Sequence, residues 1–254
     1  MCLDRPYYEN LNTHPYIYYV VFGVKDKELN ISKERHRIEG IPEGLNITLL
    51  TEEKNGEYMN SLINNTIGNL MKKDNLKLYK EVIKTKNWAV INGTIVKDEN
   101  LNYMKDVIGI VQAFLETGAI GVLDLQIISL YSSDEWKNKI FIPKFNPCSH
   151  VNILCTDIDK EIIWLHTRGL RKYGRPDVSI ENVNKSNIDD PIDIINQIII
   201  YSSKGSFFRN SSKLHTSKGK TFIINLTFIE DYDNVDFNNA AYYKIMWNEC
   251  KLVE

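Results

Sequence analysis

The stretch VNILCTDIDKEIIWLHTRGLRKYGRPDVSIENV, residues 151–183, decides the fold class because it places β-strands in close succession. Residues Val151–Thr156 and Glu161–Thr167 read as strands, and the acidic turn DIDK between them predicts an antiparallel pair. Arg175-Pro176 forces the chain back to an extended course, and a further strand is expected at Val178–Val183. Hairpins of this kind argue against an all-parallel sheet.

Working outward toward the N-terminus, predicted strands and helices alternate. Apolar and aromatic runs predict strands at Tyr16–Val24, around Ile47–Thr51, at Trp88–Val96 and at Ile120–Leu130. Apolar residues at helical spacing predict helices at Glu57–Lys73, at Asn75–Lys84, in the segment between Asn100 and Gly118, and in a short turn around Ser133–Lys137. The segment after Asn100 has the strongest pattern, because a cap residue precedes its apolar stripe and a glycine follows it.

On the C-terminal side, Asp190 and Pro191 predict the start of a helix that runs to about Lys204. A strand is expected at Thr221–Ile229 and a last amphipathic helix at Phe237–Cys250. Hairpins combined with crossover helices predict an α+β fold in which mixed or antiparallel sheets are flanked by helices. The proline-rich seam near Pro143–Pro147 predicts a boundary between an N-terminal half at 1–145 and a C-terminal half at 146–254, either separate or packed as one domain. Each half runs strands, helix, strand, helix, which suggests two similar α/β halves.

Composition excludes several classes of protein. The net charge of −2 argues against a dedicated nucleic-acid-binding domain. No apolar run is long enough to span a bilayer, and the N-terminal residues do not resemble a secretory signal. Four scattered cysteines suit reduced thiols rather than a disulfide framework. We therefore expect a cytoplasmic protein with neither a membrane nor a nucleic-acid partner.

The sequence contains little that indicates a metal site or a catalytic nucleophile. Cys148, His150, Cys155 and Asp157 lie within ten positions, but their spacing matches no standard zinc site, so no metal is expected. The chain contains no nucleophile elbow, no zinc-protease motif and no phosphate loop, and no cofactor is implied.

The turn inside the opening stretch is the candidate site. Arg168, Arg171, Lys172 and Arg175 would lie on one face of two helical turns, and the glycines between them would allow a ligand close to the backbone. Clustered guanidinium groups predict an anionic partner when they converge. His166 stands where the preceding strand meets the turn and reads either as a structural histidine or as part of this site. The alternative for the cations is that each points into water or pairs with a distant acid.

The segments ETGAIGVLDLQIISLYSSDEWKNKIF (116–141) and WLHTRGLRKYGRPDVSIENV (164–183) resemble a family of uncharacterised bacterial domains. That family carries a block of the form H-T-R-G-[LM]-x-K-[FY]-G-R-P-[DE]. The matching positions are His166, Thr167, Arg168, Gly169, Lys172, Gly174, Arg175, Pro176 and Asp177. The resemblance covers about the central third of the chain and implies a shared domain without implying an activity.

Two functions stay open, because the sequence does not decide whether the chain is an enzyme. The first is a non-catalytic binding or interaction module whose basic turn takes a small anionic ligand or an acidic protein partner. The second is an enzyme acting on a phosphorylated or carboxylated small molecule, with His166 as acid–base and Arg168 and Arg175 as a clamp. Convergence of these three side chains in a cleft, alongside a second titratable group, would favour the enzyme, and their separate exposure would favour the module.

Overall fold

The computed structural model describes residues 3–11, 13–25, 29–216, 219–229, 231–232, 234 and 236–246. Within this part of the chain there are seven α-helices and two sheets, of five and six strands. All strand pairs are antiparallel except one, which confirms an α+β fold with mixed and antiparallel sheets. No helix among the described residues combines the length and the apolar composition needed to cross a membrane.

Two compact units divide the described residues. Unit 1 contains Leu3 and His14–Phe145, and unit 2 contains Asp4–Thr13 together with the residues from Asn146 onward. The chain passes between the units within the proline-rich seam. The segment Asp4–Thr13 falls outside the N-terminal half proposed from the sequence because it binds to unit 2, where the Tyr7 amide donates to the Lys204 carbonyl oxygen at 3.0 Å.

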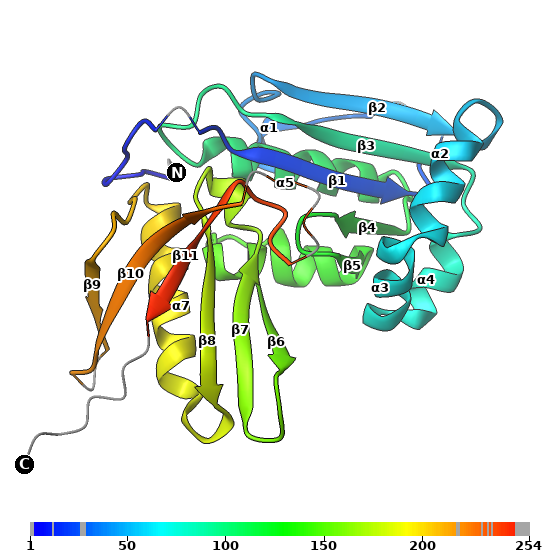
Figure 1. Ribbon diagram of the computed structural model, residues 1–254. Helices are drawn as coiled ribbons and strands as arrows, with labels where there is room; N and C mark the ends of the chain where they lie inside the picture. Colours follow the sequence, from blue (N-terminus) through cyan, green and yellow to red (C-terminus); the bar gives the residue numbers. More distant parts are fainter. Residues whose placement is uncertain are drawn as a thin grey trace, which may run out of the picture. The chain divides into compact units, whose positions relative to one another are not determined.

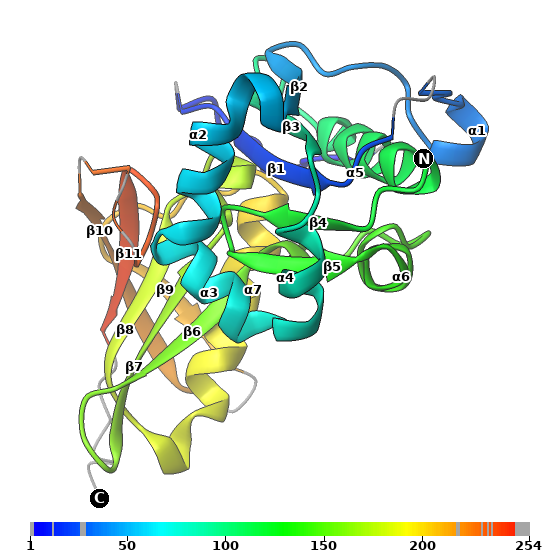
Figure 2. The ribbon, with the colours of Figure 1, turned by 90° about the vertical axis from the view of Figure 1, so that its right-hand side faces the viewer.

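Unit 1 is a sheet with helices on both faces (Figures 1 and 2). Its strands, in the order β2-β3-β1-β4-β5, are β1 (Tyr16–Phe22), β2 (Leu45–Thr51), β3 (Asn87–Thr94), β4 (Gly121–Asp124) and β5 (Ser129–Ser132). Its helices are α1 (Lys33–His36), α2 (Glu52–Asn64), α3 (Thr66–Asp74), α4 (Leu76–Val82), α5 (Asn102–Glu116), α6 (Ser133–Glu135) and the π-helix η1 (Trp136–Ile140).

The predicted strand at Tyr16–Val24 is confirmed as the central strand β1. Val20 and Phe22 pack in the cluster that α2, α3 and α4 form with the sheet, whereas the alternate residues Tyr19 and Val21 point to the other face. Strand β1 is therefore buried on both faces, as its continuous apolar sequence indicates. The apolar stripe after Asn100 is likewise buried in α5.

Two elements predicted in unit 1 are each divided in the structure. The helix predicted at Glu57–Lys73 is interrupted at Asn65, whose side chain accepts hydrogen bonds from the amides of Ile67 and Gly68 and so begins α3. The strand predicted at Ile120–Leu130 is a hairpin, β4 and β5, with Ile128 in the left-handed region at φ 54°. Local capping and turn formation interrupt patterns that look continuous in the sequence.

Unit 2 is a sheet with the long helix α7 (Asp189–Ser203) on one face, behind the strands in Figure 1. The strand order is β6-β7-β8-β11-β10-β9, which differs from the order in unit 1. The strands are β6 (Asn152–Asp157), β7 (Ile162–Arg168), β8 (Asp177–Asn184), β9 (Ser212–His215), β10 (Thr221–Phe228) and β11 (Ala241–Met246). Short helical turns are η2 (Pro147–His150), η3 (Leu170–Tyr173) and η4 (Lys185–Asn187).

The hairpin predicted from the opening stretch is confirmed, with Asn152 opposite Arg168 and Cys155 opposite Leu165. The predicted C-terminal helix is wrong. Residues Ala241–Met246 form strand β11, in which Ala241, Tyr243 and Ile245 are buried and the alternate residues are more exposed. This period of two, with parallel pairing to β8 and antiparallel pairing to β10, outweighs the amphipathic pattern on which the helix was predicted. Residues 247–250 of that prediction lie outside the described residues.

We expect the substitution Gly109→Ala to destabilise the protein, although alanine normally favours a helix interior over glycine. A Cβ atom at Gly109 of α5 would lie 2.1 Å from the His36 carbonyl oxygen and 2.6 Å from the Ile38 side chain. Overpacking of this kind costs about 1–3 kcal/mol in the free energy of unfolding, which urea titration measures. The control is Gly40→Ala, where a Cβ atom meets nothing within 4 Å. Stabilisation by Gly109→Ala would contradict the close approach of α5 to the residues that follow α1.

Candidate functional site

The basic turn between β7 and β8 is not an extended helix. Leu170–Tyr173 form one turn of 3-10 helix, flanked by Gly169 at φ 120° and Gly174 at φ 63°. Arg168 ends β7 and Arg175 follows the turn, so the four cations do not share the helical face expected from their spacing. The two glycines provide the backbone conformations that side chains with a Cβ atom rarely adopt.

Arg175 is buried, with 2% of its surface exposed, and its guanidinium group is used within unit 2. It donates to the carbonyl oxygens of Glu9 at 2.9 Å, Gly174 at 2.9 Å, Gly205 at 2.6 Å and Ser206 at 3.0 Å. These carbonyl groups replace water around the charge. Arg175 therefore joins the N-terminal segment and the residues after α7 to the turn.

Lys172 and Arg168 are also buried in unit 2. The Lys172 ammonium group, fully removed from solvent, donates to the His150 carbonyl oxygen at 2.8 Å. Arg168 approaches the Asn234 carbonyl oxygen at 3.5 Å. Arg171 differs, because it is only partly buried: it donates to the Asn238 side chain at 3.2 Å and lies over the Tyr232 ring. The prediction of an anion-binding surface at this turn consequently depends on Arg171.

Asp177, the acid next to the basic turn, is buried and stabilises the turn by accepting hydrogen bonds. Its carboxylate accepts hydrogen bonds from the Thr167 hydroxyl at 2.8 Å, the Leu170 amide at 3.2 Å and the Asn239 amide group at 2.8 Å. Burial raises the pKa of the Asp177 carboxyl to about 6, against these hydrogen bonds and the charge of Arg168, which lower it. The local role of Asp177 is thus to fix the ends of β7 and β8.

His166 lies under aromatic rings rather than in an open cleft. Its imidazole stacks on Trp164 with ring centroids 4.0 Å apart and meets Phe237 edge-on at 5.6 Å. Only 2% of the residue is exposed, and burial lowers the pKa of the His166 imidazole. Its Nδ1 atom has no hydrogen-bond partner among the described residues. His166, Arg168 and Arg175 therefore do not converge on an accessible ligand position.

A second candidate lies in unit 1, where a cavity of about 450 Å³ opens beside α1, α5 and the residues that follow η1. Its apolar lining includes Ile108 of α5, Ile140 at the end of η1 and Phe141. Its cationic lining consists of Lys33, Arg37, Lys105 and Lys144. The sequence does not reveal this cavity because its lining residues come from four separated segments, although the cluster FIPKF (141–145) marks one wall.

Arg37 is the unusual residue of this cavity. It follows α1 with φ 59° and ψ 36°, a left-handed conformation that costs a non-glycine residue about 1–2 kcal/mol. Its guanidinium group lies over the Phe141 ring, 4.5 Å from the ring centroid. Within the described part of the chain, Arg37 forms no ion pair, whereas Lys33 and Lys105 both approach Glu39.

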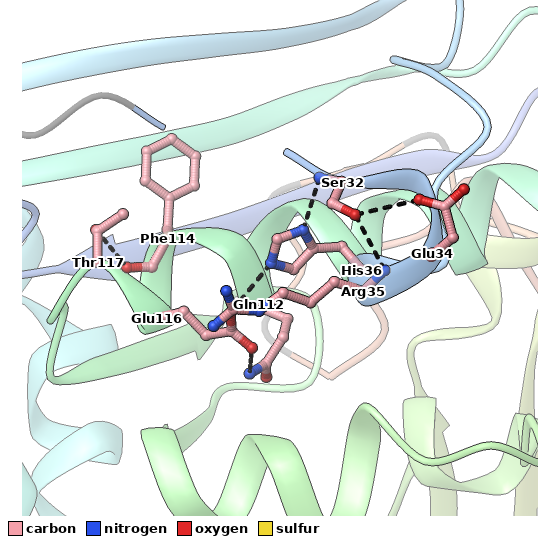
Figure 3. A network of polar contacts seen from close by, with 8 residues as sticks. All are labelled: Ser32, Glu34, Arg35, His36, Gln112, Phe114, Glu116 and Thr117. Atoms are coloured by element: carbon pink, nitrogen blue, oxygen red, sulfur yellow. Dashed lines mark hydrogen bonds and ion pairs between the residues drawn. The ribbon is translucent and has the colours of Figure 1, made fainter. Parts of the chain in front are cut away.

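The wall of the cavity formed by α1 is fixed by a polar network (Figure 3). The Ser32 amide donates to Nδ1 of the His36 ring at 2.9 Å, which leaves the proton on Nε2, 3.2 Å from the Glu116 carboxylate. Gln112 donates to the same carboxylate at 2.9 Å, and Arg35 forms an ion pair with it. Burial raises the pKa of Glu116, but these hydrogen bonds and the cation lower it overall. The network joins α1 to the last turn of α5.

A larger cavity in unit 1, of about 610 Å³, has a mainly apolar lining that includes Leu49, Trp88 and Phe114. Lys25 and Leu29, which also line it, flank residues outside the described part of the chain. Among the described residues, no group of three or more histidine, cysteine or acidic side chains is arranged to hold a metal ion.

Comparison with protein-family models, with curated proteins and with solved structures finds no match for this chain. The resemblance of the block that begins at His166 to an uncharacterised bacterial family therefore stays a prediction from the motif.

We expect Arg175→Ala to lower the free energy of unfolding by about 3–5 kcal/mol, because it leaves buried carbonyl groups without their donor. The matched control is Arg171→Ala, which removes a partly exposed cation from the same turn and should cost about 1 kcal/mol or less. Thermal unfolding of both variants and the wild type, with and without phosphate, separates a structural role from an anion clamp. Protection of the wild type by phosphate that both variants lack would contradict the structural role of Arg175.

We expect acid to destabilise unit 2 through His150. Burial and the neighbouring Lys172 charge lower the pKa of the His150 imidazole to about 3. An unfolded histidine titrates near about 6.5, so the unfolded chain binds a proton that the folded chain excludes between these pH values. Stability that is complete above about pH 6.5 should fall by about 2 kcal/mol by about pH 5.

Urea unfolding of the wild type and of His150→Gln across this pH range measures the effect, and the variant should lose this part of the slope. Exposed His215 supplies the control His215→Gln, which should keep it. Asp177 opposes the trend, since its raised pKa makes the folded chain bind an extra proton below about pH 6. Equal slopes for the wild type and His150→Gln would show that His150 is not held neutral by burial.

Proposed function

We propose that the chain is a non-catalytic binding module and that the cavity beside α1 takes a small organic anion with an apolar body. The proposal keeps the small anionic ligand suggested by the sequence but moves it from the basic turn to unit 1. It is supported by the use of Arg168, Lys172 and Arg175 within the fold of unit 2. It is also supported by the aromatic cover over His166, which leaves that group no open approach for a substrate.

The size and lining of the cavity suit such a ligand. Small-molecule sites usually occupy about 300–1,000 Å³ and combine an apolar lining with a few polar groups. Here about 450 Å³ is lined by Ile108, Ile140 and Phe141, with cations among them. The π-helix η1, whose last residue lines the cavity, is a form of backbone often found at functional sites.

Arg37 carries the proposal. A guanidinium group offers a planar pair of donors that matches a carboxylate, and its aromatic neighbour Phe141 holds the plane in a defined orientation. The cavity is also lined by the acids Glu34 and Glu39, and Glu39 lies near both Lys33 and Lys105. Among the described residues Arg37 pairs with neither acid, so its charge is available to a bound anion. The cost of its left-handed backbone is consistent with a residue retained for binding.

The test is isothermal titration calorimetry with octanoate, octanol and inorganic phosphate. We expect octanoate to bind best, because only octanoate offers both a carboxylate and an apolar chain. Charge-assisted hydrogen bonds contribute about 1.5–3 kcal/mol, so Arg37→Gln should weaken octanoate binding about tenfold or more and leave octanol unchanged.

The matched control is Arg209→Gln, which makes the same change of charge in unit 2. Arg209 pairs with Glu9 at the surface and is not among the residues that line the cavity, so octanoate binding should stay within about twofold. Equal binding of octanol and octanoate, or equal loss in both variants, would overturn the role of Arg37. Absence of binding by all three compounds would overturn the proposed site.

A further inference from the structure

Exposed lysines occur in α3, in α4 and in the turn after α4 in unit 1. This lysine ridge consists of Lys72, Lys73, Lys77, Lys80 and Lys84, all of them exposed. Residues 72–86 contain six lysines and two acidic residues, a local charge of +4 in a chain whose net charge is −2. Positive charge is thus concentrated in this segment, although the whole chain carries a small net negative charge.

The two helices form a continuous support for the ridge. Asn75 ends α3 and also begins α4, where its side chain accepts a hydrogen bond from the Leu78 amide at 3.1 Å. Leu78 and Val82 face the core of unit 1, which leaves Lys77 and Lys80 on the outer side of α4, and Lys84 follows in the turn after the helix. Lys77 and Lys80 therefore point away from the core, and Lys72, Lys73 and Lys84 are exposed at the ends of the two helices.

Interactions within the described residues of unit 1 do not neutralise the positive charge of the ridge lysines. No ion pair involving the five ridge lysines occurs among the described residues, whereas the neighbouring Lys86 pairs with Glu52 at 3.3 Å. Asp74, one of the two nearby acids, accepts a hydrogen bond from the Leu130 amide at 2.7 Å. The helix dipole favours Lys72 and Lys73 at the end of α3, but it does not explain lysines along the outer side of α4.

We infer that the lysine ridge docks an acidic segment of a partner protein. Carboxylates spaced along such a segment would meet the ammonium groups, and the exposed Leu76 side chain, 46% accessible, offers an apolar contact among them.

Sequence-tolerant binding of single-stranded nucleic acid commonly adds aromatic stacking, but the Tyr79 hydroxyl is bound to the Ile63 carbonyl oxygen and its ring is half-buried. Membrane-surface helices insert an apolar face, and the apolar face of α4 is occupied by its own core.

The experiment measures the fluorescence anisotropy of a labelled peptide of alternating glutamate and alanine with one central leucine. Three lysine charges are reversed together in Lys77→Glu/Lys80→Glu/Lys84→Glu, which should weaken peptide binding about tenfold or more. The matched control Lys160→Glu/Lys204→Glu/Lys213→Glu makes the same change of net charge at exposed lysines outside the ridge and should weaken it less than about threefold. Binding should also fall as salt rises from about 50 to about 200 mM.

Circular dichroism and thermal unfolding check that each variant is folded, and the neutral set Lys77→Gln/Lys80→Gln/Lys84→Gln replaces the reversed set if that set is not. Oligothymidylate and vesicles containing phosphatidylserine are titrated in parallel. Equal losses in ridge and control variants, or binding of oligothymidylate or vesicles in preference to the peptide, would overturn the inference.

Discussion

The buried guanidinium group of Arg175 joins three separate segments of unit 2 through hydrogen bonds to their carbonyl oxygens. Removing a charge from water is costly, and the cost is offset only when the group is fully hydrogen-bonded. Arg175 is stabilised in this way by carbonyl oxygens from Glu9, from its own turn and from Gly205 and Ser206, which follow α7. A lysine at this position would present a compact ammonium group with three donors, which matches this planar arrangement poorly.

Cations are used in three physically different ways along the chain. Arg175 and Lys172 are satisfied by neutral main-chain oxygens in the interior of unit 2. Lys33 and Lys86, like several other surface cations, pair with nearby glutamates, an arrangement that contributes little to stability in water. Arg37 and the lysine ridge belong to neither group. The difference lies in what surrounds the charge, and a count of basic residues does not reveal it.

The sequence predicted the elements whose signals are local. The β6–β7 hairpin, the central strand β1 and the stripe of α5 all depend on side-chain patterns a few residues long. The hydrogen-bond partners of the cations in the basic turn could not be predicted in this way, because the acceptors of Lys172 and Arg175 are carbonyl groups up to 166 positions away. Every residue has a carbonyl group, so such partners leave no mark in the sequence. The cavity was hidden for a related reason, since Arg37 and Phe141 meet only after α1, α5 and η1 have packed.

The place of β11 in its sheet has a consequence for how the protein is made. Strand β11 lies between β8 and β10, although β8 and β10 both precede it in the chain. As the polypeptide leaves the ribosome, β6, β7 and β8 can associate early, while β10, once paired with β9, must wait for β11, which is translated after it. During that interval the edges of β8 and β10 are open to incorrect pairing. Unit 1 has its strands and helices available before any of this, so the order of synthesis favours a nascent chain in which unit 1 is folded while unit 2 is still incomplete.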